Sequence, residues 1–306
     1  MEDMRKIGFS MAALAVLAGI VGFFLRYLEV NTIFDSYTGL ALRWAPISLA
    51  LIGLSVVTVG LLLLLSLRIP PRRISSFQAA FGNSWPTGLL LALLGFCVIF
   101  LATLEALYLA ESGSVSVMTY LQAGSALLSG FCLAYMAMKG PKGGDVAPVA
   151  SALPVSWICL WLISFHITNA SNPVLLEYAY MFFALAFLLL ALYYIASFAF
   201  LQDKSKKLLF CSPVALYFIG VTMGDPHPSY HRGLLLCLAA TLLIYHITLT
   251  VNLSRSPPDE PEEEMDWDHM LESAIWDTEL EEVRKPKKRK KAKKAKEDIF
   301  DIDAEW

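Results

Sequence analysis

The chain has 306 residues, of which 57% are hydrophobic and 17% are charged, and its formal net charge is −3. In soluble domains about a quarter of the residues are charged. The charges are also unevenly placed, because the first 253 residues contain only 13 Lys and Arg and 10 Asp and Glu. This composition excludes an ordinary soluble protein and predicts an all-α integral membrane protein, with residues 1–253 as the membrane domain and residues 254–306 as a cytoplasmic tail.

Eight apolar segments are candidates for membrane-crossing helices. The hydrocarbon core of a bilayer is about 30 Å thick and needs roughly 20 apolar residues in a helix. The segments lack the alternation of a β-barrel, and helices satisfy their own backbone groups in lipid. The seventh segment is short and contains Pro213 and Gly220, which makes it the weakest. The eight predicted spans are Ile7–Tyr27, Trp44–Leu67, Thr87–Ala110, Val115–Met138, Ala147–Phe165, Pro173–Phe200, Leu208–Met223 and Gly233–Leu253.

The distribution of positive charge predicts the orientation of the bundle. If the amino terminus lies inside, the segments on the inner side contain eleven Lys and Arg before the basic tail, and those on the outer side contain three. Lys and Arg are enriched in short cytoplasmic loops. We therefore expect both termini in the cytoplasm and the spans in the plasma membrane, and an even number of spans agrees with this.

The inner loop RIPPRRISSFQAAFGNSWP has the pattern of a short amphipathic helix. Ile74, Phe77 and Phe81 recur at helical spacing behind Arg72 and Arg73. Such a helix would lie in the membrane interface. A plain connector between two spans is the alternative.

Polar and charged residues within or beside the spans gather near one side of the membrane. Such residues are costly in lipid and point to function. Their placement predicts an outward-facing polar vestibule above an apolar inner half, with Glu105 and Glu177 as carboxylates and the three outer arginines as their partners. Structural ion pairs between helix ends are the alternative. The candidate ligand-binding residues are Arg26, Arg43, Glu105, Gln122, His166, Glu177 and Arg232.

The stretch MGDPHPSYHR offers Asp225, His227 and His231, and Asp and His are zinc ligands. Pro226 and Pro228 favour an extended turn that does not present these side chains on one face, so a hydrophilic cap is favoured and no metal or cofactor site is predicted. Motifs of nucleophilic or nucleotide-dependent enzymes, such as GxSxG or a P-loop, are absent. This favours a non-enzymatic role and leaves an enzymatic one open.

The tail has four segments of different composition. A Pro-rich acidic stretch predicts a disordered linker, and a following amphipathic pattern that includes Trp267, Leu271 and Ile275 predicts a helix that docks on a cytoplasmic protein or folds back under the bundle. The basic run 284–296 is expected to bind anionic lipid headgroups. The tail as a whole is acidic, with 11 cations and 17 carboxylates, which argues against a nucleic-acid partner.

The end of the tail, EDIFDIDAEW, combines carboxylates with large apolar residues. Phe300 and Trp306 stand among these acids as a short linear motif that a partner could capture. A solvated tail without a partner is the alternative.

The stretch FFLRYLEVNTIFDSYTGLALRWAPISLALIGLSVV, from Phe23 to Val57, resembles small multi-pass membrane proteins of clostridial-type bacteria with no assigned function. The resemblance covers about a tenth of the chain. It implies the plasma membrane of a Gram-positive bacterium and implies no activity.

Two functions fit these observations. The first is a non-enzymatic sensor or scaffold, in which the vestibule receives a signal and the tail recruits a cytoplasmic protein. The second is a small-molecule or proton-coupled transporter that uses Glu105 and Glu177. A transporter needs a polar path or a broken helix that reaches the middle of the membrane, whereas a sensor can have a solid inner half.

Overall fold

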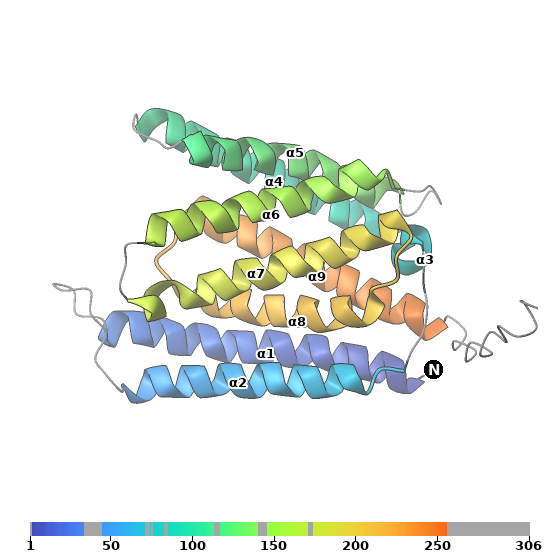
Figure 1. Ribbon diagram of the computed structural model, residues 1–306, viewed down its shortest axis with the longest axis horizontal. Helices are drawn as coiled ribbons and strands as arrows, with labels where there is room; N and C mark the ends of the chain where they lie inside the picture. The colour runs from blue at the N-terminus through green and yellow to red at the C-terminus, as the bar shows by residue number, and fades with distance from the viewer. Residues whose placement is uncertain are drawn as a thin grey trace, which may run out of the picture. The chain divides into compact units, whose positions relative to one another are not determined.

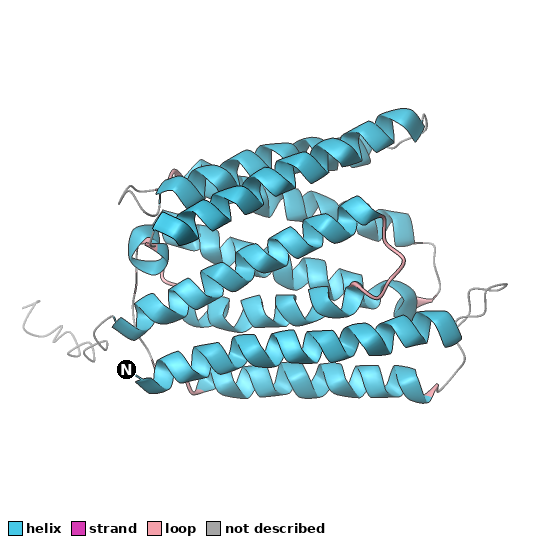
Figure 2. Cartoon of the chain, turned by 180° about the vertical axis from the view of Figure 1, so that it is seen from behind, coloured by secondary structure: helices cyan, strands magenta, loops and turns pink. Residues whose placement is uncertain are grey.

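The computed structural model describes residues 2–33, 45–70, 74, 76–82, 85–112, 117–139, 146–170 and 174–255, without the side chains of residues 2–3, 112 and 175–177. All regular structure within these residues is helical (Figure 2). The elements are α1 (Glu2–Thr32), α2 (Pro46–Leu67), α3 (Phe77–Phe81), α4 (Trp85–Ser112), α5 (Val117–Lys139), α6 (Pro148–Asn169), α7 (Leu175–Ser197), the 3-10 turn η2 (Phe198–Phe200), α8 (Ser205–Thr222) and α9 (Ser229–Arg255).

The long helices of the described residues, α1, α2 and α4 to α9, lie side by side with similar axis directions, and successive helices run in opposite directions (Figure 1). Seven of them, all except α8, are long and apolar enough to cross a membrane. Many large apolar side chains on these helices face outward, such as Leu17 at 64% exposure, Val56 at 67% and Phe100 at 63%. Outward-facing apolar surface of this extent fits lipid as the solvent. The all-helical, multi-span class predicted from the composition is confirmed.

The helix α8 differs from the prediction that all eight segments are ordinary spans. It forms where the seventh segment was predicted, but it is only 18 residues long and begins with Ser205, Lys206 and Lys207. These residues lower its mean hydropathy, so its composition does not identify it as a span. Most of its side chains are buried between α1, α7 and α9, and a helix surrounded by other helices does not need a lipid-facing surface.

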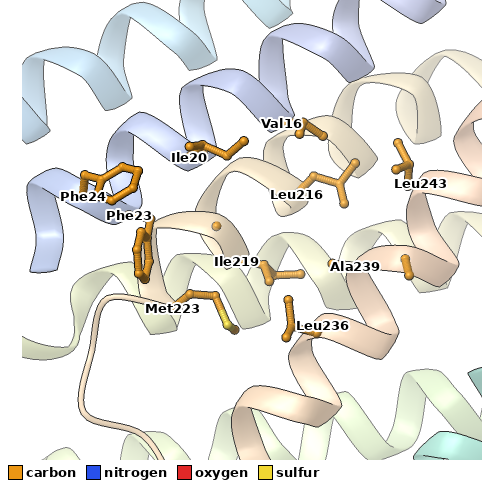
Figure 3. Close-up of a pocket in the computed structure, with 13 residues that line it drawn as sticks. Val16, Ile20, Phe23, Phe24, Leu216, Ile219, Met223, Leu236, Ala239 and Leu243 are labelled. Atoms are coloured by element: carbon orange, nitrogen blue, oxygen red, sulfur yellow. The ribbon is translucent and has the colours of Figure 1, made fainter.

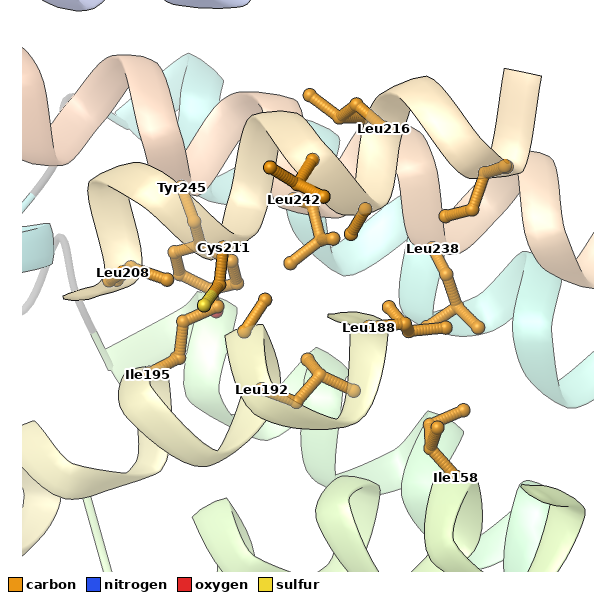
Figure 4. Packing of buried hydrophobic residues seen from close by; sticks show 14 of the residues in the cluster. Ile158, Leu188, Leu192, Ile195, Leu208, Cys211, Leu216, Leu238, Leu242 and Tyr245 are labelled. Atoms are coloured by element: carbon orange, nitrogen blue, oxygen red, sulfur yellow. The ribbon is translucent and has the colours of Figure 1, made fainter. Parts of the chain in front are cut away.

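The core of the bundle lies where α7, α8 and α9 meet. Figure 4 shows Leu188 and Leu192 of α7 packed toward Leu242 and Tyr245 of α9, with Cys211 of α8 between them. All five side chains are at most 5% exposed. Leucine and aromatic side chains on facing helices fill this region, which leaves it apolar.

Two helix pairs approach closely at glycines. A Cβ atom on Gly220 of α8 would lie 2.9 Å from the Cα atom of Gly19 on α1. A Cβ atom on Gly95 of α4 would lie 2.7 Å from the backbone nitrogen of Ala134 on α5. Small residues allow helix backbones to pack closely where lipid provides no hydrophobic driving force. These contacts fix α1 against α8 and α4 against α5.

The inner loop does form a short helix, α3, and its aromatic side chains point into the bundle. The ring of Phe81 lies 5.0 Å from that of Tyr245 and 5.2 Å from that of Phe198. Asn252 of α9 donates hydrogen bonds to the carbonyl oxygens of Ala80 and Gly82. The segment is therefore more than a plain connector, because it is packed and capped by the bundle.

Candidate functional site

Glu105 is one of the residues that line a cavity of about 260 Å³ near one end of the bundle. Glu105 lies two turns before the end of α4, and Gln122 lies near the start of α5. Because α4 and α5 are consecutive and antiparallel, these two positions meet. The Glu105 cavity is completed by α6, α7, the segment between α8 and α9, and the start of α9, including Trp161, Met181 and His231.

Only one oxygen of the Glu105 carboxylate is used in the structure. Its Oε1 atom accepts a hydrogen bond of 3.2 Å from Nε2 of Gln122 and lies 3.1 Å from Nε2 of His231. An ionised carboxylate only accepts hydrogen bonds, so this contact assigns a proton to Nε2 of His231. The Oε2 atom is buried and has no hydrogen-bond partner among the described residues.

Aromatic rings and small polar groups form the wall of the Glu105 cavity. The ring of His231 lies 5.2 Å from that of Trp161 and 4.6 Å from that of Tyr230. The side chains of Thr168 and Asn169 donate to backbone carbonyls of their own helix. Among the described residues that line this cavity, Glu105 is therefore the one whose buried side chain has a polar atom without a hydrogen-bond partner.

A second polar group, the Arg26 cluster, joins α1 to the segment before α9. The Nε atom of Arg26 lies 2.5 Å from Oδ1 of Asp225, and its Nη1 atom lies 2.7 Å from Oε2 of Glu29. All three residues are buried, with exposures of 4% or less. Removing one partner of a buried ion pair leaves an uncompensated charge, at a cost of about 3–5 kcal/mol. The cluster thus holds the end of α1 firmly against this segment.

Asp225 is further fixed by its neighbours. Thr222 donates a hydrogen bond of 2.9 Å to its Oδ2 atom, and Nη2 of Arg232 donates to its carbonyl oxygen at 2.8 Å. Burial raises the pKa of the Asp225 carboxyl above its ordinary value, although the positive charge of Arg26 opposes this rise.

Thr222 and His227 connect the Arg26 cluster to the Glu105 cavity. The hydroxyl of Thr222 lies 3.0 Å from Nε2 of His227, and His227 lines the cavity. Burial lowers the pKa of His227 to about 4, so the ring is neutral near pH 7. Because the Thr222 hydroxyl donates to Asp225, it accepts the Nε2–H of His227. A continuous hydrogen-bonded path therefore runs from Arg26 to the cavity wall.

The structure places the described vestibule candidates in different surroundings. Glu105 and Gln122 share the cavity, whereas Arg26 and Arg232 meet at Asp225. Arg26 is therefore paired with Asp225 and Glu29, and Glu105 with His231, in place of the expected pairing of arginines with Glu105. His166 is exposed and its ring contacts Phe182 outside the cavity lining.

The remaining predicted site residues lie outside the described part of the chain. These are Arg43, the side chain of Glu177, and all of the tail, including Trp267, Leu271, Ile275, Phe300 and Trp306.

Sequence reasoning understated three residues near the start of α9, two in the segment before it and one in its first turn. Asp225, His227 and His231 were interpreted as a hydrophilic cap, yet Asp225 is buried and both histidines line the Glu105 cavity. The sequence feature that could have indicated this is the run of ionisable residues that ends at Arg232, directly before the last predicted span. Among the described residues no group of three His, Cys, Asp or Glu side chains has the geometry of a metal site.

Comparisons with protein-family models, with curated proteins and with solved structures find no match to this chain. Its class therefore rests on its own fold, which is that of a multi-span helical membrane protein. The resemblance of residues 23–57 to clostridial-type membrane proteins stays a prediction.

Proposed function

We propose that this protein is a non-enzymatic membrane sensor that binds a small organic ammonium ion in the Glu105 cavity. The observation that carries the proposal is that Glu105, whose buried Oε2 atom has no hydrogen-bond partner among the described residues, lines a cavity that also has aromatic rings in its wall. An N–H group of an ammonium ion would satisfy this oxygen, and the faces of Trp161 and Tyr230 would attract its positive charge.

A sensor is favoured over a transporter by the packing next to the cavity. One turn further into the bundle, α6 contributes Trp157 and Ile158, α7 contributes Leu185, and α9 contributes Leu234 and Leu235, and each of these is fully buried. The core in Figure 4 continues this apolar packing. A transported ion needs a polar path to the middle of the membrane, and side chains of this kind do not line one.

The proposed orientation has eight crossings, with both termini in the cytoplasm and the Glu105 cavity open to the outside. The 18 residues of α8 give it a length of about 27 Å, close to the thickness of the hydrocarbon core. Lys206 and Lys207 would then lie at the inner surface, as the positive-inside rule prefers. If α8 crosses the membrane, the ends of α7 and α9 also lie on the sides that the charges in the adjoining loops predict.

The tail would carry the response of the sensor. Its basic run 284–296 would bind anionic lipid headgroups of the inner leaflet, and its segments around Trp267 and Phe300 would recruit a cytoplasmic protein. Removing residues 267–306 should abolish recruitment while ligand binding in the cavity stays unchanged.

The binding proposal is tested with the full-length protein in nanodiscs and ethanolamine as the probe. Calorimetric titration should detect binding of ethanolamine, and Glu105→Gln should weaken it by about tenfold or more, because the loss of a charge-assisted hydrogen bond costs about 1.5–3 kcal/mol. Glu111→Gln is the matched control, since Glu111 is exposed on the same helix. Ethylene glycol, which lacks the ammonium group, should not bind.

Equal affinities of the wild-type protein for ethanolamine and ethylene glycol would contradict the proposed ligand class. Uptake of labelled ethanolamine into proteoliposomes, lost in Glu105→Gln, would favour the transporter instead.

A further inference from the structure

Two of the five free cysteines lie opposite one another on neighbouring helices. Cys97 is on α4 and Cys237 is on α9, and these two helices pack against each other. The side chains of Cys97 and Cys237 are in hydrogen-bonding contact. Neither residue lines the Glu105 cavity or belongs to the Arg26 cluster. The pair is therefore a candidate site of its own.

Contacts near the Glu105 cavity define how α4 and α9 are aligned. The ring of Tyr108 on α4 lies 5.6 Å from that of Tyr230 on α9, and Glu105 contacts His231. Tyr108 and Glu105 are three residues apart, so both lie on the face of α4 that is turned toward α9. Because the two helices are antiparallel, residue numbers fall along α4 as they rise along α9.

The same alignment continues to the two cysteines. A Cβ atom on Gly233 of α9 would lie 2.9 Å from Cδ1 of Leu101 on α4, so the glycine allows the two helices to approach closely here. Cys97 comes four residues before Leu101, and Cys237 comes four residues after Gly233. Residues four apart share one face of a helix. The alignment therefore places the two thiols opposite each other, in agreement with their contact.

Another face of α9 borders an apolar cavity. This cavity has a volume of about 490 Å³ and lies between α1, α8 and α9, where Figure 3 shows Leu236, Ala239 and Leu243 of α9 around it. Cys237 is not part of its lining. The thiol of Cys237 is thus on the side of α9 that packs on α4, and its described contact is with the thiol of Cys97.

The position of the pair along the helices limits the reagents that can reach it. Both α4 and α9 are candidate membrane spans. Cys97 comes twelve residues after Trp85 and fifteen before Ser112, which corresponds to about 18 Å and 22 Å along the helix. Cys97 is exposed on the surface of the bundle, and Cys237 is partly exposed. In a bilayer these thiols face hydrocarbon, so a reagent that reacts with them must dissolve in lipid.

We propose that Cys97 and Cys237 form a redox site, in which a membrane quinone oxidises the two thiols to a disulfide that links α4 to α9. One sulfur–sulfur bond forms and both S–H bonds break. The two electrons and the two protons pass to the quinone, which is reduced to a quinol. No charge is left in the hydrocarbon region, where an isolated ion would be costly. A quinone also dissolves in the bilayer, as the position of the thiols requires.

The disulfide would act on the Glu105 cavity, a consequence that rests on the function proposed above. Glu105 is eight residues from Cys97 on α4, and His231 is six residues from Cys237 on α9. The link would hold the two helices together close to the contact between Glu105 and His231. Any separation of α4 from α9 on ligand binding would then be opposed, so the oxidised protein should bind the ammonium ion more weakly than the reduced protein.

The test treats the full-length protein in nanodiscs with decylubiquinone and counts the free thiols by alkylation and mass spectrometry after denaturation. We expect the wild-type protein to lose two of its five free thiols, with one quinol formed for each disulfide, and peptide mapping to find Cys97 linked to Cys237. The variants Cys97→Ser and Cys237→Ser should each keep all their remaining thiols. Cys132→Ser, which changes a cysteine of α5, is the matched control and should still lose two.

Copper phenanthroline, a lipid-soluble catalyst of thiol oxidation, separates the pairing of the cysteines from the identity of the oxidant. A link between Cys97 and Cys237 that forms with copper phenanthroline but not with decylubiquinone would overturn the quinone as the oxidant. Failure of both reagents to link them would overturn the redox site. Equal affinities of the reduced and the linked protein for ethanolamine would overturn the effect on the Glu105 cavity, whereas the thiol count does not depend on whether ethanolamine binds.

Discussion

Buried polar side chains at one end of the bundle form two groups, the Arg26 cluster and the contacts of Glu105. Arg26 is paired with two carboxylates, but Oε1 of Glu29 and Oε2 of Glu105 are buried without a hydrogen-bond partner among the described residues. An unsatisfied buried group persists only when something compensates its cost. For Glu105 we assign this role to the proposed ammonium ion.

The sequence placed Glu105 and Gln122 in one group of candidates without predicting their contact, and it did not predict the pairing of Arg26 with Asp225. Glu105 and Gln122 lie on consecutive antiparallel helices, so their depths in the membrane determine that they meet. Arg26 and Asp225 are 199 residues apart, and their pairing depends on α1 packing against α8. Hydropathy and charge alone do not determine which distant helices are neighbours.

The stability of the protein should fall as the pH decreases from about 6.5 to about 4. The pKa of His227 is lowered from 6.5 to about 4 in the folded state, so the unfolded chain binds the proton first over this range, and the contribution of His227 to stability is lost as the pH falls. His227→Gln, which retains a donor for Thr222, should reduce the pH dependence.

Melting temperatures measured in detergent between pH 4 and pH 7 would test this predicted fall in stability. His166→Gln, which changes a histidine at an exposed position, is the control. The same pH dependence in His227→Gln and in the wild-type protein would contradict the role assigned to His227.

At the scale of helices, close backbone contacts at glycine determine which surfaces meet. The α1–α8 pair depends on Gly19 and Gly220, and the α4–α5 pair depends on Gly95 and its contact with Ala134. These glycines lie in apolar segments where the sequence pattern gives them no special signal. The positions of the seven candidate membrane spans were predictable from hydropathy, but the contacts between them were not.

Gly220→Val should destabilise the bundle by about 1–3 kcal/mol, because its Cβ atom would clash with the backbone of Gly19. Gly124→Val is the control, since a Cβ atom on Gly124 would have no atom within 4 Å. Unfolding in mixed detergent micelles would measure the difference, and similar free energies of unfolding for the two variants would show that the α1–α8 contact tolerates a larger residue.

At the scale of the whole molecule, the number of crossings depends on α8. Its composition is too polar at its start to identify it as a span, yet its neighbours α7 and α9 bury most of its surface. A central helix of a bundle is selected for packing against other helices, and hydropathy is then a weaker guide than it is for a helix that faces lipid.

Labelling of single cysteines would determine whether α8 crosses the membrane. In a background without the five native cysteines, Pro226→Cys and Gln202→Cys place exposed thiols at the two ends of α8. We expect a membrane-impermeant maleimide to label Pro226→Cys in intact cells and Gln202→Cys only after permeabilisation, because the two ends of a crossing helix face opposite sides. Labelling of both variants in intact cells would mean that α8 enters and leaves on one side.

The 27-residue helix α9 reaches from the Glu105 cavity to the start of the tail. Its first turns carry His231, which contacts Glu105, and its last turns carry Asn252, which holds α3. Midway, His246 contacts both Ser212 of α8 and the carbonyl oxygen of Gly8 on α1. The helix carries the contact with Glu105 near one end and is followed by the tail at the other. A shift of His231 along the helix would therefore displace the point where the tail is attached, about 36 Å away.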